Sequence, residues 1–318
     1  MSRTKIIIDC DPGQDDALNL FLAFASPERF DVLGITTVAG NAPLSLTSRN
    51  ARLLCELVGR GDVAVFQGCE NPIVVPPSHA HHVHGESGID GLVIREPQMP
   101  LQSQHAANFI VEACRAHRDR PVTMVATGPL TNLATALVLD PRIKQGIERI
   151  VIMGGAMREG GNITPSAEFN MWFDPHAADI VLRCGLPVVA FGLDVTHQVL
   201  VTQSRLRRIA ALNNRVAQSA YDMLSFFNRY DSNKYGTDGA PLHDACTIAY
   251  LLRPELFQLK LCNVTVECGS PLSRGHTAVD FWHVTEGPRN VNWAYGVDAE
   301  ALFDLLYERL SFFGEASA

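Results

Sequence analysis

Residues 5–20 have the sequence KIIIDCDPGQDDALNL, and this stretch decides the fold. Three successive isoleucines, Ile6–Ile8, predict a strand that is covered on both faces, because nearly continuous apolar runs are typical of parallel sheets. Pro12 and Gly13 then predict a turn, and the apolar spacing of Ala17–Ala25 predicts a helix. A strand, a turn and a helix in this order form the first part of a βαβ unit.

The same alternation of short β-branched runs and amphipathic stretches continues along the chain. The predicted strands are Lys5–Cys10, Val32–Val38, Val63–Phe66, Val122–Ala126, Arg149–Met153 and Val188–Phe191. After Ala17–Ala25, the predicted helices are Leu44–Val58, Ala106–Ala116, Leu130–Val138 and Pro175–Arg183. This pattern favours the α/β class, with a mostly parallel (mixed), Rossmann-like sheet flanked by helices.

The alternation weakens in the C-terminal third of the chain, where Leu206–Phe227 predicts a helix and Leu261–Cys268 a further strand. A length of 318 residues allows either two domains or one large core. No Ser/Pro/Gly-rich linker, low-complexity tract or internal repeat divides the sequence. We therefore expect a single domain, residues 1–318, with a helical C-terminal elaboration.

The composition limits the classes of partner and the compartment. A chain with 47% apolar and 19% charged residues is globular rather than disordered. The net charge of −8 lacks the basic footprint expected for nucleic acid or an anionic membrane, and no apolar run is long enough for a span. Two carboxylates directly follow the first short apolar run, so we expect no signal peptide. Eight scattered cysteines without a CxxC pair predict free thiols and a cytoplasmic location.

Four carboxylates, those of Asp9, Asp11, Asp15 and Asp16, fall within eight residues at the end of the first predicted strand. Asp9 and Asp11 are two apart and therefore point to the same face of the strand. Such a cluster repels itself unless a cation or hydrogen bonds compensate, and oxygen ligands suit a hard ion, Ca²⁺ or Mg²⁺. The alternative is helix capping by a solvated acidic turn.

Polar side chains also follow the later strands, whose carboxyl ends form the edge where open α/β sheets bind ligands. Singly, each is typical of a turn. Together, they predict an edge lined by amides and carboxylates, which suits a neutral polyol better than a phosphate. The residues concerned are Asn41, Asn162, Glu168 and Asn170, with Gly128 in ATGPLTN allowing a close backbone approach.

Two groups of histidines stand apart from these motifs. The stretch SHAHHVHGESG, residues 78–88, contains His79, His81, His82 and His84, and its prolines and serine predict a mobile surface loop with mostly solvated histidines rather than a transition-metal site. In PLHDA, Asp244 can complete an oxygen-rich ion site while His243 titrates near neutral pH. The alternative is a capping Asp244 beside an exposed His243.

The combined motifs resemble those of the nucleoside hydrolases, the inosine–uridine-preferring N-ribohydrolases. They are IIIDCDPGQDDALNL, TVAGN, HGESGIDGLV, ATGPLTN, IVIMGGA, AEFNMWFDP and PLHDA, and they follow the family order from residue 6 to about residue 250. The resemblance implies a tightly bound Ca²⁺, held by Asp11, Asp16, the carbonyl of Thr127 and Asp244. It also implies Asp11 as the base that activates water and His243 as the leaving-group residue. The ribose contacts that it implies are Asp15, Asn41, Asn162, Glu168 and Asn170.

The pyrimidine-preferring branch of the family resembles this chain in pairing a loop histidine, here His84, with Tyr235 and His243. The expected activity is therefore Ca²⁺-dependent hydrolysis of ribonucleosides to free base and ribose, with uridine and cytidine favoured. Asp231 departs from that branch, in which a neutral amide is more common, so a purine or non-specific preference, or a modified ribosyl compound, is the alternative substrate. The resemblance also implies a homotetramer or homodimer.

Two other classes compete with this interpretation. Haloacid-dehalogenase-like phosphatases also begin with a strand that ends in DxD, but they need Thr or Val where this chain has Gly13. A nucleoside-binding protein without turnover would need neither the base Asp11 nor the donor His243. The sequence therefore favours the hydrolase over both alternatives.

Overall fold

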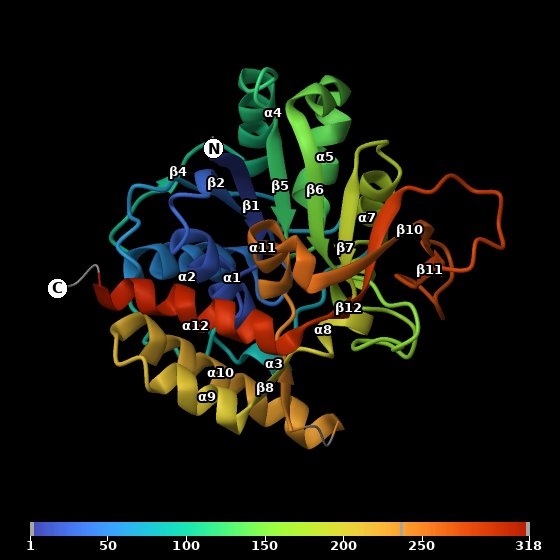
Figure 1. The fold of residues 1–318 in the computed structure, drawn as a ribbon. Helices are drawn as coiled ribbons and strands as arrows, with labels where there is room; N and C mark the ends of the chain where they lie inside the picture. The colour runs from blue at the N-terminus through green and yellow to red at the C-terminus, as the bar shows by residue number, and fades with distance from the viewer. Residues whose placement is uncertain (1–2, 236–237, 316–318) are drawn as a thin grey trace.

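The structure is a computed structural model that describes residues 3–235 and 238–315, without the side chains of residues 81–82, 230–235 and 315. Within that part of the chain, ten strands form one sheet in the order β11-β10-β12-β7-β6-β5-β1-β2-β3-β4 (Figure 1). Neighbouring strands are parallel except where β10 pairs with β11 and β12. The strands of this sheet are β1 (Thr4–Cys10), β2 (Phe30–Thr37), β3 (Val65–Gln67), β4 (Leu101–Gln102), β5 (Val122–Ala126), β6 (Ile147–Met153), β7 (Val188–Phe191), β10 (Phe257–Val266), β11 (Thr277–Asp280) and β12 (Val291–Val297). A separate antiparallel pair consists of β8 (Leu200–Thr202) and β9 (Gly239–Pro241).

Helices cover both faces of the sheet. They are α1 (Gln14–Phe24), α2 (Leu44–Leu57), α3 (His81–His84), α4 (Ala106–Ala116), α5 (Thr131–Leu139), α6 (Phe169–Phe173), α7 (Pro175–Leu182), α8 (Leu193–Thr196), α9 (Gln203–Ala210), α10 (Arg215–Tyr235), α11 (Ala245–Leu252) and α12 (Ala299–Glu315), with 3₁₀ turns at Pro141–Gly146 and Pro254–Leu256. Helix α1 contacts α10, α11 and α12 on one face, whereas α4, α5 and α7 pack together on the other (Figure 1).

The side chains of β1 separate the two halves of the core. Ile6 and Ile8 belong to the apolar cluster under α1, α11 and α12, and Ile7 belongs to the cluster under α4, α5 and α7. All three isoleucines are fully buried. This alternation explains the apolar run in the sequence, since consecutive residues of a strand point to opposite faces and here both faces are covered.

The strand order places a topological switch point beside β1. The chain moves from β1 outward through β2, β3 and β4, and then returns to β5 on the other side of β1. Ligands of open α/β sheets bind at the carboxyl ends of the strands, next to such a reversal. The segments that follow β1, β2, β5, β6 and β7 are therefore the ones that the fold brings to a common site.

The fold class expected from the sequence is confirmed, and several elements have the predicted bounds, among them Val122–Ala126, Val188–Phe191 and Ala106–Ala116. The single helix predicted over Leu206–Phe227 is wrong, since the structure has α9 and α10 there. Asn213, in the short connection between them, has a φ of 52°, a left-handed conformation that breaks the helical path and that asparagine tolerates well. The C-terminal region contributes helices as expected, but it also adds three strands to the main sheet, of which only β10 was predicted.

Two further expectations concern the cysteines and membrane-spanning segments. All eight cysteines are free thiols, and most are buried. Among the described residues, every helix is either too short or too polar to cross a bilayer.

Candidate active site

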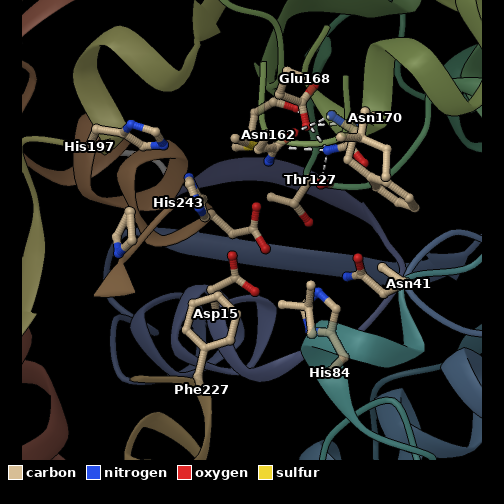
Figure 2. A pocket seen from close by; sticks show the side chains of 17 residues that line it. Asp15, Asn41, His84, Thr127, Asn162, Glu168, Asn170, His197, Phe227 and His243 are labelled. Carbon is tan, nitrogen blue, oxygen red and sulfur yellow. Dashed lines mark hydrogen bonds between the residues drawn. The ribbon is translucent and has the colours of Figure 1, made fainter. Parts of the chain in front are cut away.

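A cleft of about 740 Å³, open to solvent, lies at the carboxyl edge of the sheet, beside the switch point. Figure 2 shows Glu168, Asn162 and Asn170 together on one side, and His84 and Asn41 together on another. His243 and His197 lie near each other on a third side. The residues that line the cleft are Asp15, Asn41, Ala80, Val83, His84, Thr127, Met153, Asn162, Ile163, Glu168, Phe169, Asn170, His197, Phe227, Pro241, His243 and Asp244.

Three buried carboxylates meet at the floor of this cleft. Asp15 and Asp16 come from the first turn of α1, and Asp244 comes from the residue before α11. Each offers a carboxylate oxygen within 4.8 Å of the others. Burial and the neighbouring Asp16 raise the pKa of Asp15 to about 8. Burial, with Asp15 and Asp16 as neighbours, also raises the pKa of Asp244 well above its usual range. Simultaneous ionisation of all three carboxyl groups is therefore unfavourable without a cation.

Asp11 lies beside this cluster, in a pocket of backbone. Its Oδ2 accepts a hydrogen bond of 2.7 Å from the backbone N–H of Asn41. A Cβ at Gly40 or Gly128 would overlap the Asp11 carboxylate, so glycine is required at both positions for this close approach. Burial, followed by repulsion from Asp16, raises the pKa of Asp11 well above its usual range.

The residues present fit a hard cation. Asp11 Oδ1 and Asp15 Oδ1 are buried and have no hydrogen-bond partner among the described residues. Unpartnered buried carboxylate oxygens are costly, and an oxygen-seeking cation such as Ca²⁺ would satisfy them. Asp244 makes no side-chain cap bond to α11, so capping does not explain its position. The cluster of mutually close carboxylates contains Asp15 together with the predicted ligands Asp16 and Asp244.

Thr127 and Asn170 tie the carboxylate floor to the amide side of the cleft. The Thr127 hydroxyl donates to Asp16 Oδ1 at 2.7 Å, and its carbonyl accepts from Asn170 Nδ2 at 2.7 Å. Glu168 accepts from the backbone N–H groups of Gly155 and Asn170, at 2.9 and 2.8 Å, and burial raises its pKa. These bonds fix the polar wall before any ligand arrives.

Two further amide side chains, Asn162 on this wall and Asn41 on another side of the cleft, are also held by backbone. Asn162 Oδ1 accepts from the N–H of Phe169 at 2.9 Å, and Asn41 Nδ2 donates to the carbonyl of Asp11 at 3.1 Å. Asp15, Asn41, Asn162, Glu168 and Asn170 all line the cleft, so the structure brings together every predicted ribose contact.

His84 is a buried exception among the loop histidines, which the sequence predicted to be mostly solvated. It ends the short helix α3 and is only 6% exposed. Its Nδ1 lies 2.7 Å from Gln14 Oε1, and Gln14 Nε2 donates to the carbonyls of His84 and Asp90. Its ring stacks on Phe227 with centroids 5.7 Å apart. These partners hold the His84 ring against the cleft.

His243 lies across the cleft, half-buried between α8 and the carboxylate floor. Its Nδ1 is 2.8 Å from the Thr196 hydroxyl, and its ring centroid is 5.7 Å from that of His197. Burial, with the nearby His197 and His84, lowers the pKa of His243 well below its usual range. The ring is therefore neutral near pH 7.

Sequence reasoning missed part of the cleft. His197 and Phe227 line it, and Thr196 supports it, but nothing in their local sequence distinguishes them from ordinary core or loop residues. Met153 also lines the cleft, and it belongs to the IVIMGGA motif, but no site role was predicted for it. Of the predicted base-pocket residues, Asp231 and Tyr235 belong to the last turns of α10, and their side chains lie outside the described part of the structure.

The fold and the site define an α/β protein whose small-molecule cleft joins a buried carboxylate cluster to a preorganised amide wall. Residues 6–304 match the family described as inosine-uridine preferring nucleoside hydrolase. The chain belongs to this family, and it is an N-glycosyl hydrolase of ribonucleosides.

Individual relatives span nearly the whole chain. The chain is 45% identical over 312 residues to the pyrimidine-specific ribonucleoside hydrolase RihA of Photobacterium profundum. The alignment covers 98% of this chain and 99% of that relative. Among solved structures, the purine-preferring ribonucleoside hydrolase from Gardnerella vaginalis is 31% identical with a TM-score of 0.90, covering 98% of this chain and 100% of that one. A plant nucleoside hydrolase is 32% identical with a TM-score of 0.91, covering 98% and 99%.

Proposed function

We propose that the protein hydrolyses the N-glycosidic bond of ribonucleosides in a Ca²⁺-dependent reaction that favours uridine and cytidine. The observation that carries the proposal is the cluster of buried carboxylates with Asp11 beside it, which together leave two oxygens unpartnered, opposite a wall of fixed amides. No lysine or arginine occurs among the described residues that line the cleft. This favours a neutral nucleoside over a nucleotide, because a phosphate would meet carboxylates without a compensating cation side chain.

The residues that we propose to hold the ion are Asp11, Asp16, the carbonyl of Thr127 and Asp244, with Asp15 beside them. A divalent cation held there would keep these carboxylates ionised and would supply positive charge that orients the ribose hydroxyls and lowers the pKa of nearby water. We assign the ribose contacts to Asp15, Asn41, Asn162, Glu168 and Asn170, whose arrangement around the cleft supports this role.

The proposed reaction requires a base that activates water, a leaving nucleobase and stabilisation of the positive charge on the ribose. Asp11 Oδ1 accepts a proton from water as the water oxygen attacks C1′. The electron pair of the C1′–N bond leaves with the base, which then takes up a proton. Positive charge develops on the ribose, and the carboxylates of Asp15 and Glu168 stabilise it in a preorganised site. Direct displacement by water predicts inversion at C1′.

His84, His243 and Tyr235 are the residues that we propose to contact the base. The similarity to a pyrimidine-specific relative supports uridine and cytidine, whereas one structural neighbour is called purine-preferring. Asp231 stands where the pyrimidine-preferring branch more often has a neutral amide. The alternative substrate is therefore a purine nucleoside, a range of nucleosides without preference, or a modified ribosyl compound. The eight free thiols support a cytoplasmic location. A homotetramer or homodimer follows only from the family resemblance.

The test is the release of base and ribose from uridine, cytidine, inosine and adenosine, with and without prior removal of Ca²⁺ by a chelator. We expect hydrolysis that is fastest for uridine or cytidine, is lost on chelation and returns when Ca²⁺ is added. Faster turnover of inosine would refute the base preference alone. Full activity after chelation would refute the Ca²⁺ requirement, and four intact nucleosides would refute their role as substrates.

A further inference from the structure

Thr196 is the last residue of α8 and contacts His243, but it is not itself among the residues that line the cleft. It is fully buried, and its Oγ1 lies 2.8 Å from His243 Nδ1. Helix α8 begins directly after β7, so the main sheet fixes the position of the hydroxyl. The contact joins two segments that are 47 residues apart in the sequence.

The direction of this hydrogen bond follows from the partners that are present. A buried hydroxyl donates its proton wherever it has an acceptor. Among the described residues, His243 Nδ1 is the one hydrogen-bond partner of the Thr196 hydroxyl, and no backbone carbonyl competes for its proton. The hydroxyl therefore donates to the Nδ1 lone pair. A neutral imidazole that accepts at Nδ1 carries its own proton at Nε2.

We propose that Thr196 is a positioning residue that holds His243 in the tautomer protonated at Nε2, so that the ring presents an N–H donor to the departing base. The inference rests on the proposed function and deepens it. His243 lines the cleft, and its Nε2 has no hydrogen-bond partner among the described residues. The Nε2–H group thus stabilises negative charge that develops on the base, without giving up its proton.

The first test is direct observation of the tautomer. The wild-type protein, labelled with ¹⁵N-histidine, is examined by long-range ¹H–¹⁵N correlation at about pH 8, and the missing signals of His243→Gln assign the ring. We expect protonation at Nε2 in the wild type and in Thr196→Ser, and a mixture of tautomers in Thr196→Val. Protonation at Nδ1 in the wild type, or an unchanged tautomer in Thr196→Val, would overturn the inference.

The second test separates positioning from mere support of the fold. We expect Thr196→Val to lower kcat for uridine and inosine roughly tenfold to a hundredfold, less than the loss expected on removing a charge-stabilising donor outright, because part of the His243 population keeps its Nε2–H group. Hydrolysis of 4-nitrophenyl riboside, whose leaving group is stable as an anion, should change less than about threefold. Thr196→Ser should restore most of the lost rate, since it retains the hydroxyl.

Thr123→Val is the matched control. It removes another buried threonine hydroxyl, one without a hydrogen-bond partner in the described structure, from β5. We expect this variant to hydrolyse both substrate types at the wild-type rate. Equal losses on both substrates in Thr196→Val would overturn the inference. If no nucleoside is hydrolysed but the tautomers behave as expected, the proposed function is wrong and the role of Thr196 in fixing the ring is retained.

Discussion

Each acidic side chain in or beneath the cleft has its own hydrogen-bond partners, and these partners decide what the carboxylate can do. Asp16 is held by the Thr127 hydroxyl at 2.7 Å and by the backbone N–H of Gly13 at 3.0 Å. Asp11 is held at Oδ2 alone, and its Oδ1 is buried without a hydrogen bond. A fully hydrogen-bonded carboxylate is a poor base, whereas one with a free lone pair can accept a proton. This difference favours Asp11 as the base.

The first prediction at this scale is that Asp11→Asn abolishes turnover. The amide has nearly the same shape and can still accept the N–H of Asn41, but it cannot take a proton from water. We expect a loss in kcat of about a thousandfold, within the range of general-base effects. The rate of base release from uridine measures it.

Asp31→Asn is the control for this substitution. Asp31 lies on the neighbouring strand β2, where it pairs with Lys5 at 3.0 Å outside the cleft. We expect it to keep the wild-type rate. More than about a tenth of the wild-type activity in Asp11→Asn would contradict the role of Asp11 as base.

Single residues also show where sequence reasoning ends. Asp15, Glu168 and Asn170 were predicted because each belongs to a dense local motif, and the structure places them on the cleft. Thr196 and His197 belong to no such motif, and their importance comes only from contact with His243, which is far along the chain. Contacts of this kind depend on tertiary packing, which one sequence does not display.

Among the elements, α7 has a start that is fixed by one buried side chain. Asp174 Oδ1 accepts from the N–H of Ala177 at 3.0 Å, which caps the helix. Its Oδ2 accepts from the Thr131 hydroxyl, at the start of α5, and from the N–H of Ile73, both at 2.9 Å. One carboxylate thus joins two helices and a loop next to the wall that carries Glu168.

We therefore predict that Asp174→Ala lowers the free energy of unfolding by about 3 kcal/mol, because it removes a cap and leaves buried donors unpaired. Asp179→Ala on the same helix is the control, since it removes only a half-exposed pair with Arg183 at 3.7 Å. That loss should stay below about 0.5 kcal/mol. Urea unfolding at constant m value measures both, and equal midpoints for the two variants would refute the argument.

The elements also differ in how far the sequence predicted them. Fully buried strands such as β5 have uninterrupted apolar runs, and their predicted bounds agree with the structure. Strand β10 has a mixed pattern of buried and exposed residues, because it lies near the edge of the sheet, and its prediction is shifted by several residues. Strands β11 and β12 were not predicted, because partial exposure interrupts the apolar pattern by which a strand is recognised in a sequence.

For the molecule as a whole, the buried acids make stability depend on pH in an unusual direction. Burial raises the pKa of Asp9 to about 6 and, together with Asp16, that of Asp15 to about 8. A carboxyl with a raised pKa in the folded state binds its proton more tightly there than in the unfolded chain. The stability that such a carboxyl contributes is fully present below about pH 4, near the pKa of the unfolded chain. It is lost as the pH rises through the pKa of the folded state. Without a cation, the protein should therefore lose stability between about pH 4 and pH 8.

A bound divalent cation should reverse this trend, because it favours the ionised carboxylates that the metal-free fold disfavours. We predict that the Tm of the chelated protein falls between pH 5 and pH 8. At pH 8, Ca²⁺ at about a hundred times its Kd should restore about 3 kcal/mol, or roughly 5 °C. The gain should be smaller at pH 5, where protons compete with the ion. Thermal unfolding followed by circular dichroism measures both values, with Mg²⁺ at the same concentration as a comparison.

Asp244→Asn separates binding at the cluster from a general effect of salt. The variant removes one of the three carboxylates that lie within 4.8 Å of one another and should reduce their repulsion. Its Tm without metal should therefore exceed that of the wild type at pH 8, and its gain from Ca²⁺ should be smaller. An equal gain in the variant and the wild type, or a gain at pH 5 as large as at pH 8, would place the ion elsewhere. The fold would then have to tolerate its buried acids by keeping them protonated.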